Sequence, residues 1–334
     1  MLTLVIRAPV LALGCVLAAG LSHPRSAQAQ VPTPPTDIGN VVGSALRHQA
    51  NGVLSMLSYT VLPGAAASSV ELQPAGSAHP ALSLGQFGDG TTLSESFPLF
   101  VEGFIGYSRY SPRVVFANPD GRTFTEVGGK WNSLAANGGV GWDFKLSEHW
   151  VLRPIITASL GLVASDAALA GAYLNTKYNA DLAFLERGTM NAAGAGASLV
   201  LGYYLKRPEY EIDFETRSTN GYMQTIGGTS SAVQGSAVSN AISTWERVRW
   251  PTGMDLFGRP LRYVLEQENS WYFDEQAKSL GFSTLHSIGA GLEFDTSAHE
   301  IGVWGFNMTR MRLVGRYFFG PNVTGYSVGI GISF

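Results

Sequence analysis

The last ten residues, GYSVGIGISF (325–334), alternate strictly between two kinds of side chain. Successive side chains of a β-strand point to opposite faces, so this strand would have one bulky apolar face and one face of Gly and Ser. In a soluble sandwich the outer face would usually carry long polar groups, whereas in a membrane barrel the bulky face meets lipid and the small face lines the lumen. We therefore predict a membrane strand whose lipid-facing residues are Tyr326, Val328, Ile330, Ile332 and Phe334.

Residues 1–29 are typical of a cleaved secretory signal. Arg7 precedes the apolar run PVLALGCVLAAGL, and small residues at Ala27 and Ala29 form a cleavage site. The run is shorter than the roughly 20 residues that a membrane-spanning helix needs. The single cysteine of the chain, Cys15, falls inside this segment, so the mature protein would contain no disulfide; a lipoprotein attached at Cys15 is the weaker interpretation.

The composition favours an outer-membrane protein of a Gram-negative bacterium. Charged residues make up 14% of the chain, compared with about 25% in ordinary soluble domains. There are 40 glycines, and the mean hydropathy is slightly positive at +0.09 although no apolar run after the signal is long enough for a membrane helix. With 22 basic and 25 acidic residues, the chain has no electrostatic basis for binding nucleic acid.

Between the signal and the strands, residues 30–62 combine a Pro-rich lead with a predicted helix over 37–60. Apolar residues recur there at helical spacing, and Arg47 and His48 lie on the opposite, polar face. The helix either lies against the periplasmic rim or enters the lumen as a plug. We predict a helix held in or against the lumen that keeps the barrel closed, with Arg47 meeting a carboxylate of the strand at 211–215.

Residues 63–334 have the rhythm of an antiparallel barrel, with alternating segments separated by turns of unequal length. Ten strands are predicted from residue 98 onward, and weaker segments near 65–74 and 81–88 raise the count to twelve. A bulge near Thr309 would reconcile a change of phase in the strand at 300–317. The predicted fold is an all-β transmembrane antiparallel barrel of about 12 strands (10 to 12) with an N-terminal helix. The long connections, which would all lie at one end, are 113–131, 165–187, 221–239 and 272–280.

Several charged residues fall on the predicted lumen face of their strands. A structural lattice of ion pairs explains them best, because a buried charge without a partner is costly, and selectivity in transport is the alternative. These lumen-facing candidates are Arg153, Glu211, Asp213, Glu215, Arg217, Arg262, Glu266 and Glu268.

Two resemblances support this interpretation. The final strand, with Phe334 as terminal aromatic residue, resembles the C-terminal assembly signal of bacterial outer-membrane proteins. The segments SYTVLPGAAASSVEL and PLFVEGFIGYSRYSP, with the Gly-rich last strand, resemble the solitary outer membrane autotransporter beta-barrel domain family. That resemblance implies an autotransporter-like barrel without a passenger, and it implies no enzyme activity.

The sequence therefore predicts a non-enzymatic barrel, which includes the possibility of a narrow or helix-plugged pore. The alternative is an outer-membrane hydrolase of the phospholipase or protease type with a barrel-borne site. His286 is the one histidine within a strong strand, but Ser287 faces the other way, which is a poor arrangement for a nucleophile and its base. No cofactor and no metal-ligand spacing is expected. The expected partners are outer-membrane lipids and the barrel assembly machinery, and the oligomeric state is left open.

Overall fold

The computed structural model describes thirteen stretches of the chain. They are residues 51–60, 68–74, 82–110, 113–117, 124–128, 130–166, 189–229, 234–256, 258–295, 302–303, 306–307, 310–321 and 323–333. The predicted signal at 1–29, the Pro-rich lead, the first part of the predicted helix with Arg47 and His48, Thr309 and Phe334 lie outside them.

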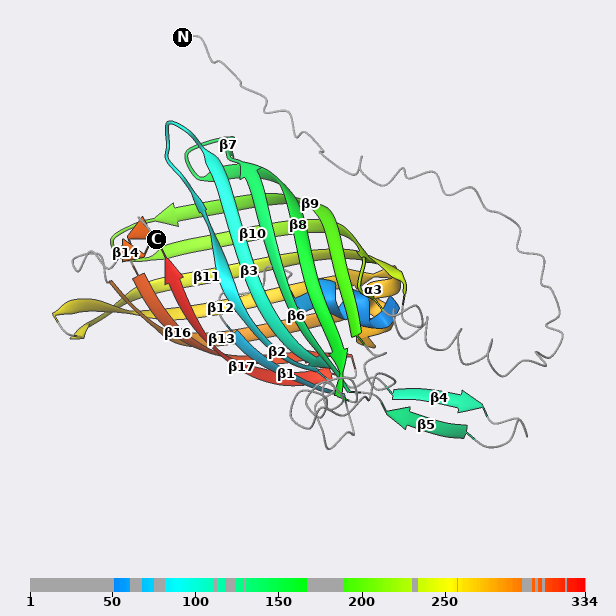
Figure 1. Cartoon of the computed structure of the whole chain (residues 1–334). Coiled ribbons are helices and arrows are strands. Elements are labelled where there is room, and N and C mark those ends of the chain that lie inside the picture. Colours follow the sequence, from blue (N-terminus) through cyan, green and yellow to red (C-terminus); the bar gives the residue numbers. More distant parts are fainter. Residues whose placement is uncertain are drawn as a thin grey trace, which may run out of the picture.

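Twelve antiparallel strands form a closed barrel (Figure 1). The first strand pairs with the last, which closes the ring, and the weak segments near 65–74 and 81–88 are both strands. The order round the barrel is β1 (Ser68–Pro74), β2 (Leu82–Thr92), β3 (Leu99–Tyr110), β6 (Trp131–Trp142), β8 (Trp150–Ser165), β9 (Thr189–Lys206), β10 (Glu211–Thr225), β11 (Ser236–Leu256), β12 (Arg259–Phe273), β13 (Thr284–Asp295), β16 (Arg310–Gly320) and β17 (Val323–Ser333).

The register of the strands defines their tilt. Paired residues can be followed once round the barrel from Thr189 on β9, through Arg109 on β3 and Tyr326 on β17, back to Tyr203 on β9. The path returns fourteen residues further along the same strand. With about 3.3 Å per residue and about 4.8 Å between strands, this stagger corresponds to a tilt of about 39°.

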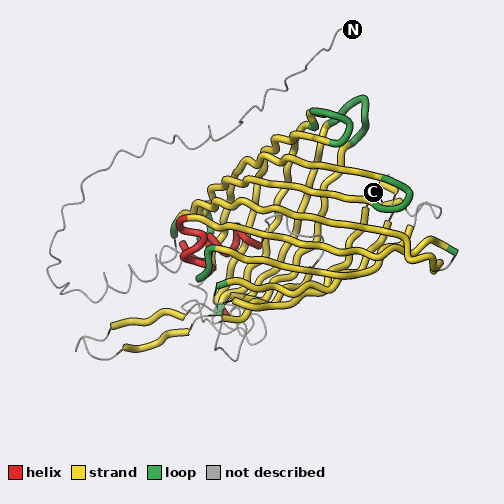
Figure 2. Tube along the Cα trace, turned by 180° about the vertical axis from the view of Figure 1, so that it is seen from behind, coloured by secondary structure: helices red, strands yellow, loops and turns green. Residues whose placement is uncertain are grey.

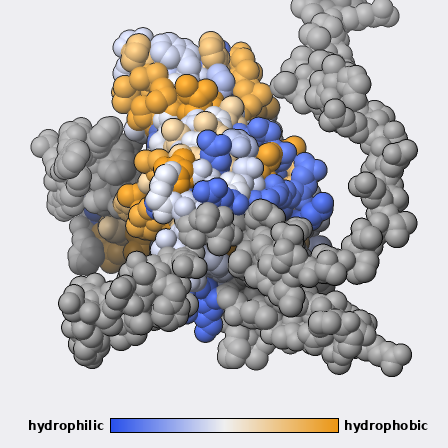
Figure 3. Space-filling model, turned by 45° about the vertical axis from the view of Figure 1, so that its right-hand side comes forward, coloured by the Kyte–Doolittle hydropathy of each residue, from blue (hydrophilic) through white to orange (hydrophobic). Residues whose placement is uncertain are grey.

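The two faces of the wall differ as the alternation predicts. On the outer face of β17, Tyr326, Val328 and Ile330 are 63%, 60% and 50% exposed, while Ser327 between them is buried. Apolar residues cover broad areas of the described surface in Figure 3, and hydrophilic residues gather in one part of that view. An apolar exterior around a polar interior is the pattern of a membrane β-barrel. Among the described helices, none has the length and apolarity needed to cross a membrane.

The two ends of the barrel are unlike. We call the end with the long connections the loop end; it carries the connections at 111–130, 166–188 and 226–235 and the helix α3 (Asp274–Leu280). We call the other end the turn end; it carries the short connections at 93–98, 146–149, 207–210 and 257–258 and one longer connection at 296–309, and β17 runs towards it. On the usual rule for such barrels, the loop end is extracellular.

The structure corrects several predicted boundaries. The strands β10 and β11 extend well into the region 221–239, because Tyr222 and Val238 pair with each other in the ladder. The predicted connection 113–131 contains the hairpin of β4 (Arg113–Ala117) and β5 (Phe124–Gly128). The single strand predicted over 300–317 is instead a short hairpin of β14 (Gly302–Val303) and β15 (Phe306–Asn307) followed by β16. A two-residue strand, β7 (Phe144–Lys145), continues β6 against β8.

Candidate functional site: the filled lumen

Residues 51–60 form a helix that lies inside the barrel at the loop end (Figures 1 and 2). Its residues Val53, Leu54, Met56 and Leu57 are each at most 1% exposed. Two apolar clusters enclose the helix from opposite sides of the wall. The first contains Val53, Leu54 and Leu57 with Trp131, Ala135, Val163, Met190, Ala192, Met223 and Ala237, and the second contains Met56 with Leu82, Leu84, Ala241, Tyr272, Phe282, Leu285, Phe318 and Val323.

Polar contacts hold both ends of the described segment 51–60. At its last residue the Thr60 hydroxyl lies 2.8 Å from the Ser108 hydroxyl of β3, and Gln86 of β2 donates to the Thr60 carbonyl at 3.3 Å. At its first residue, Asn51 Oδ1 accepts a hydrogen bond from the Ser236 amide at 3.2 Å. These contacts join the helix to strands on different sides of the barrel, so they define its position in the lumen.

Two glycines of the wall leave room for the helix. A Cβ added at Gly161 of β8 would lie 2.3 Å from Leu57 Cδ2, and one at Gly106 of β3 would lie 2.3 Å from the Thr60 carbonyl oxygen. Real Cβ atoms do not approach other heavy atoms so closely, so these positions exclude any larger residue while the helix stays in place. The wall and the helix are therefore closely fitted.

The turn half of the lumen contains a lattice of arginines and carboxylates. Glu266 of β12 accepts hydrogen bonds from Arg247 Nε of β11 at 2.6 Å and from Arg316 Nη2 of β16 at 2.5 Å. Glu293 of β13 is 1% exposed and faces three arginines, with N···O distances of 3.5 to 3.8 Å to Arg249, Arg310 and Arg312. Burial of this kind means that side chains, and not a wide water column, occupy this part of the lumen.

Glu211 is a second node of the lattice, at the turn end of β10. It accepts from Arg310 Nη1 at 2.6 Å, from Arg262 Nη1 at 2.5 Å, and it lies 3.2 Å from Arg249 Nη2. Asp213, two residues further on, accepts from Arg249 Nη2 at 2.6 Å. Glu211 and Asp213 therefore each have charged donors, as buried ions require.

Two further pairs fill the opposite side of the lumen. Arg217 of β10 makes a bidentate contact with Glu102 of β3, at 2.7 and 2.9 Å. Arg153 of β8 pairs with Asp143 and lies 3.9 Å above the ring of Phe100, which is buried with Ile155 and Val200. The Arg217–Glu102 pair joins two non-adjacent strands, so it braces the wall from inside.

All eight lumen-facing candidates lie on the inner face of their strands. Six of them take part in the ion pairs just described: Arg153, Glu211, Asp213, Arg217, Arg262 and Glu266. The other two are held by hydroxyl groups, since Glu215 accepts from the Tyr204 hydroxyl at 2.7 Å and Glu268 accepts from Ser270 at 3.2 Å. The lattice also contains residues that the sequence reasoning did not name: Glu102, Asp143, Arg247, Arg249, Glu293, Arg310, Arg312 and Arg316.

The expected contact between Arg47 and a carboxylate of 211–215 falls outside the described residues, because Arg47 is not among them. Glu211 begins β10 at the turn end, whereas the described helix packs on Met223 near the loop end of the same strand. Two carboxylates of this segment, Glu211 and Asp213, are paired with arginines of the wall. The described helix and the charge lattice therefore occupy the lumen at two separate levels.

The histidine and the serine considered for a hydrolase site, His286 and Ser287, lie on opposite faces of β13 (Thr284–Asp295). Among the described residues, no group of three or more His, Cys, Asp or Glu side chains could hold a metal ion. Ser287 is buried on the inner face, while His286 lies on the outer face, where its Nδ1 is 2.8 Å from Asn269 Oδ1 and its ring is near Phe319. The serine and the histidine therefore do not form a nucleophile and base pair.

Comparisons with known proteins give similar barrels. No family model matches the chain, and no curated protein matches its sequence. Among solved structures, the beta domain of the Bordetella autotransporter BrkA has 12% identity and a TM-score of 0.44, covering 80% of this chain and 96% of that one. The translocator domain of the autotransporter NalP from Neisseria meningitidis has 10% identity and a TM-score of 0.39, with 88% and 97% covered, and LpxR from Salmonella typhimurium has 12% identity and 0.38, with 80% and 100% covered.

Proposed function

We propose that the protein is a non-enzymatic integral outer-membrane barrel, autotransporter-like and without a passenger, whose lumen is closed in the resting state by the helix at 51–60 and narrowed by the charge lattice. The observation that carries this proposal is the burial of the helix: Leu54 and Leu57 have no exposed surface within a lumen whose wall is shaped to receive them. A ring of twelve strands is wider than the eight-stranded barrels that side chains alone can fill. A ring of this width therefore needs a plug to stay closed, and in this proposal the plug is the helix at 51–60.

The plug and the lattice differ in how they could open. The helix contacts the wall mainly through apolar packing and a few neutral hydrogen bonds, whereas the lattice consists of charge-assisted bonds within the wall itself. The lattice would remain when the helix leaves, and it would then line a narrow, charged passage. Its charges are suited to tuning which ions pass.

Conductance in planar bilayers tests this proposal. A variant lacking residues 31–60 should give single-channel conductance well above that of the full-length protein, because the loop half of the lumen loses its filling. Heat-modifiable migration in a gel, which reports a folded barrel, should persist in both proteins. An intact barrel with unchanged, low conductance would show that the helix does not close the lumen.

A hydrolase is the second candidate, and the Asn269–His286 hydrogen bond on the outer wall is the observation that favours it. An amide that orients a histidine is one element of a hydrolytic site. Purified, refolded protein should show no turnover of phospholipid or peptide substrates. Turnover that disappears in a His286→Ala variant would overturn the non-enzymatic proposal.

The proposed location is the outer membrane of a Gram-negative bacterium, reached after cleavage of the signal near Ala29. The proposed partners are outer-membrane lipids, around the apolar exterior, and the assembly machinery that inserts barrels by reading their last strand. The exposed apolar residues of β17 support both. Fractionation of cells that express the protein tests the location.

A further inference from the structure

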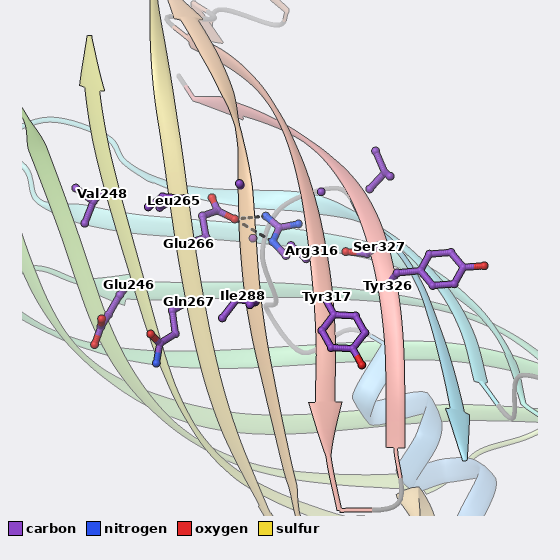
Figure 4. Close-up of a pocket in the computed structure, with 14 residues that line it drawn as sticks. Glu246, Val248, Leu265, Glu266, Gln267, Ile288, Arg316, Tyr317, Tyr326 and Ser327 are labelled. Carbon is purple, nitrogen blue, oxygen red and sulfur yellow. Dashed lines mark hydrogen bonds and ion pairs between the residues drawn. The ribbon is translucent and has the colours of Figure 1, made fainter. Parts of the chain in front are cut away.

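One part of the outer wall carries polar side chains at a depth where lipid is expected. Glu246 of β11 and Gln267 of β12 are both exposed on the outer face, and they are directly paired in the ladder. In Figure 4 the two side chains extend side by side from neighbouring strands, on the same wall as Ile288, Tyr317 and Tyr326. Thr244 on β11 and Asn269 on β12 lie two residues nearer the loop end than Glu246 and Gln267, and His286 on β13 is paired with Asn269. We call these five residues, Glu246, Gln267, Thr244, Asn269 and His286, the polar patch.

The depth of the patch follows from the tilt of the strands. At about 39°, each residue along a strand changes the depth by about 2.6 Å, and each step to the next strand along a paired row changes it by about 3 Å. Glu246 pairs with Phe214, and Phe214 pairs with Tyr203, so Tyr203 lies about 6 Å nearer the turn end than Glu246. Tyr222 is eight residues along β10 from Phe214, so it lies about 17 Å nearer the loop end than Glu246.

Tyr203 and Tyr222 therefore lie about 24 Å apart in depth, close to the height of the apolar band, about 25 Å, that aromatic girdles border in such barrels. Tyr203 packs against Trp150 at the turn end, as a girdle residue would. Glu246 and Gln267 both fall between these girdles. The polar patch thus lies within the apolar band and not at a membrane surface.

Glu246 and Gln267 have no hydrogen bond or ion pair in the part of the chain that the structure describes, whereas the other three residues of the polar patch are hydrogen-bonded to one another. Asn269 donates to the Thr244 hydroxyl at 3.4 Å and its Oδ1 lies 2.8 Å from His286. A carboxyl group and an amide in hydrocarbon without partners are unfavourable, so lipid is a poor neighbour for this wall. A protein surface can supply the missing hydrogen bonds.

A shallow groove lies beside Glu246 and Gln267. It has a volume of about 730 Å³, and its floor is made by the small outward-facing residues Ala290 and Gly315, with Ile288 and Val328 at its sides. A Cβ added at Gly315 would meet nothing within 4 Å, so the space outside the wall is open there. Small residues that form a hollow are typical of packing interfaces in membranes.

We propose that this wall, from β11 to β17, is the interface with a second copy of the chain. A two-fold axis along the membrane normal brings together residues of equal depth, and the Glu246 and Gln267 levels differ by only about 3 Å. Glu246 supplies carboxylate acceptors and Gln267 supplies amide donors, so the pair is complementary to its own copy. Each contact is then made twice, and Ile288 or Val328 of one copy fills the groove of the other.

Cysteine crosslinking tests this interface, because the single native cysteine, Cys15, lies in the predicted signal. Ile288→Cys, 53% exposed on this wall, should form disulfide-linked dimers both in cells and after reconstitution of the purified protein in phospholipid vesicles. The matched control is Ile105→Cys on β3, 58% exposed and on the far side of the ring, which should remain monomeric.

Glu246 and Gln267 should control the yield of the disulfide-linked dimer. Adding Glu246→Leu and Gln267→Leu to the Ile288→Cys protein should lower the dimer fraction by roughly tenfold, with heat-modifiable migration showing that the barrel is still folded. If Ile288→Cys links no faster than Ile105→Cys, or if the two leucines leave its dimer yield unchanged, the proposal is wrong. A crosslink to another protein in cells that is absent from the purified vesicles would assign the wall to a different partner and would also overturn it.

Discussion

Arg217 on β10 donates two hydrogen bonds to the carboxylate of Glu102 on β3, and the two strands are separated by β6, β8 and β9 in the ring. The pair therefore spans the lumen. Only 2% of the Glu102 side chain and 14% of the Arg217 side chain are exposed, and Ser198 also accepts a hydrogen bond from the guanidinium. This contact braces the half of the wall that lies opposite the Glu293 node.

Breaking this pair from one side should destabilise the barrel. Glu102→Ala leaves the buried Arg217 guanidinium without its carboxylate, which costs about 3 to 5 kcal/mol for pairs of this type. The temperature at which the protein loses its folded migration in a gel should fall accordingly. The double variant Glu102→Ala, Arg217→Ala should lose less than the sum of the single losses; additive losses would mean that the two side chains do not act as a pair.

Glu293 should determine whether the passage that remains without the helix prefers cations or anions. It faces Arg249, Arg310 and Arg312, and Glu211 also contacts the first two of these arginines, so Glu293→Gln makes the charge of this part of the lattice more positive by one unit. In the variant lacking residues 31–60, this change should shift the reversal potential under a salt gradient towards preference for anions.

A matched control for that measurement is Glu95→Gln at the turn end, where the side chain is 94% exposed and lies near Lys145. It removes the same charge without touching the lattice, so its reversal potential should equal that of the parent. An equal shift in both variants would show that total charge, and not the Glu293 position, sets the selectivity.

The alternation of the sequence predicts most strands of the ring and the direction of their side chains, although it places a single strand over 300–317 where the structure has a short hairpin and then β16. The same alternation places Arg312 and Arg316 opposite Leu313 and Tyr317 on β16, so these arginines could have been named as lumen residues. Their partners could not. Which carboxylate meets which arginine depends on the number of strands and on the stagger of fourteen residues, and these follow only when the ring closes through β1 and β17.

The helix, too, could be predicted only in part from the sequence. Its apolar spacing predicts a helix that needs an enclosing surface, and the structure places residues 51–60 within one. Its level in the barrel is not predictable from the sequence, because that level depends on the wall residues that the closed ring brings around the helix. The described helix is positioned by packing against small wall residues such as Gly161.

Filling the space at Gly161 should displace the helix. Gly161→Ala places a methyl group where Leu57 packs, and overpacking of this kind costs about 1 to 3 kcal/mol. We expect higher conductance and a lower unfolding temperature. Combining it with Leu57→Ala should recover part of both, since the smaller side chain frees that volume. The control is Gly138→Ala on β6, where an added Cβ meets nothing within 4 Å; an equal effect there would mean that glycine content, and not the helix seat, matters.

The last prediction concerns assembly of the barrel through its final strand. β17 pairs with β16 on one side and with β1 on the other, so the ring closes on the strand that ends at the C-terminus. The exposed alternation of Tyr326, Val328 and Ile330 continues in sequence to Phe334. Phe334→Asp should therefore lower the amount of protein in the outer membrane, because a charge replaces the terminal aromatic group of the proposed assembly signal. Phe334→Tyr keeps the ring and should assemble at the normal level. Quantitative blotting of outer-membrane fractions measures both variants, and wild-type amounts of the Asp variant would remove the support for recognition through the last residue.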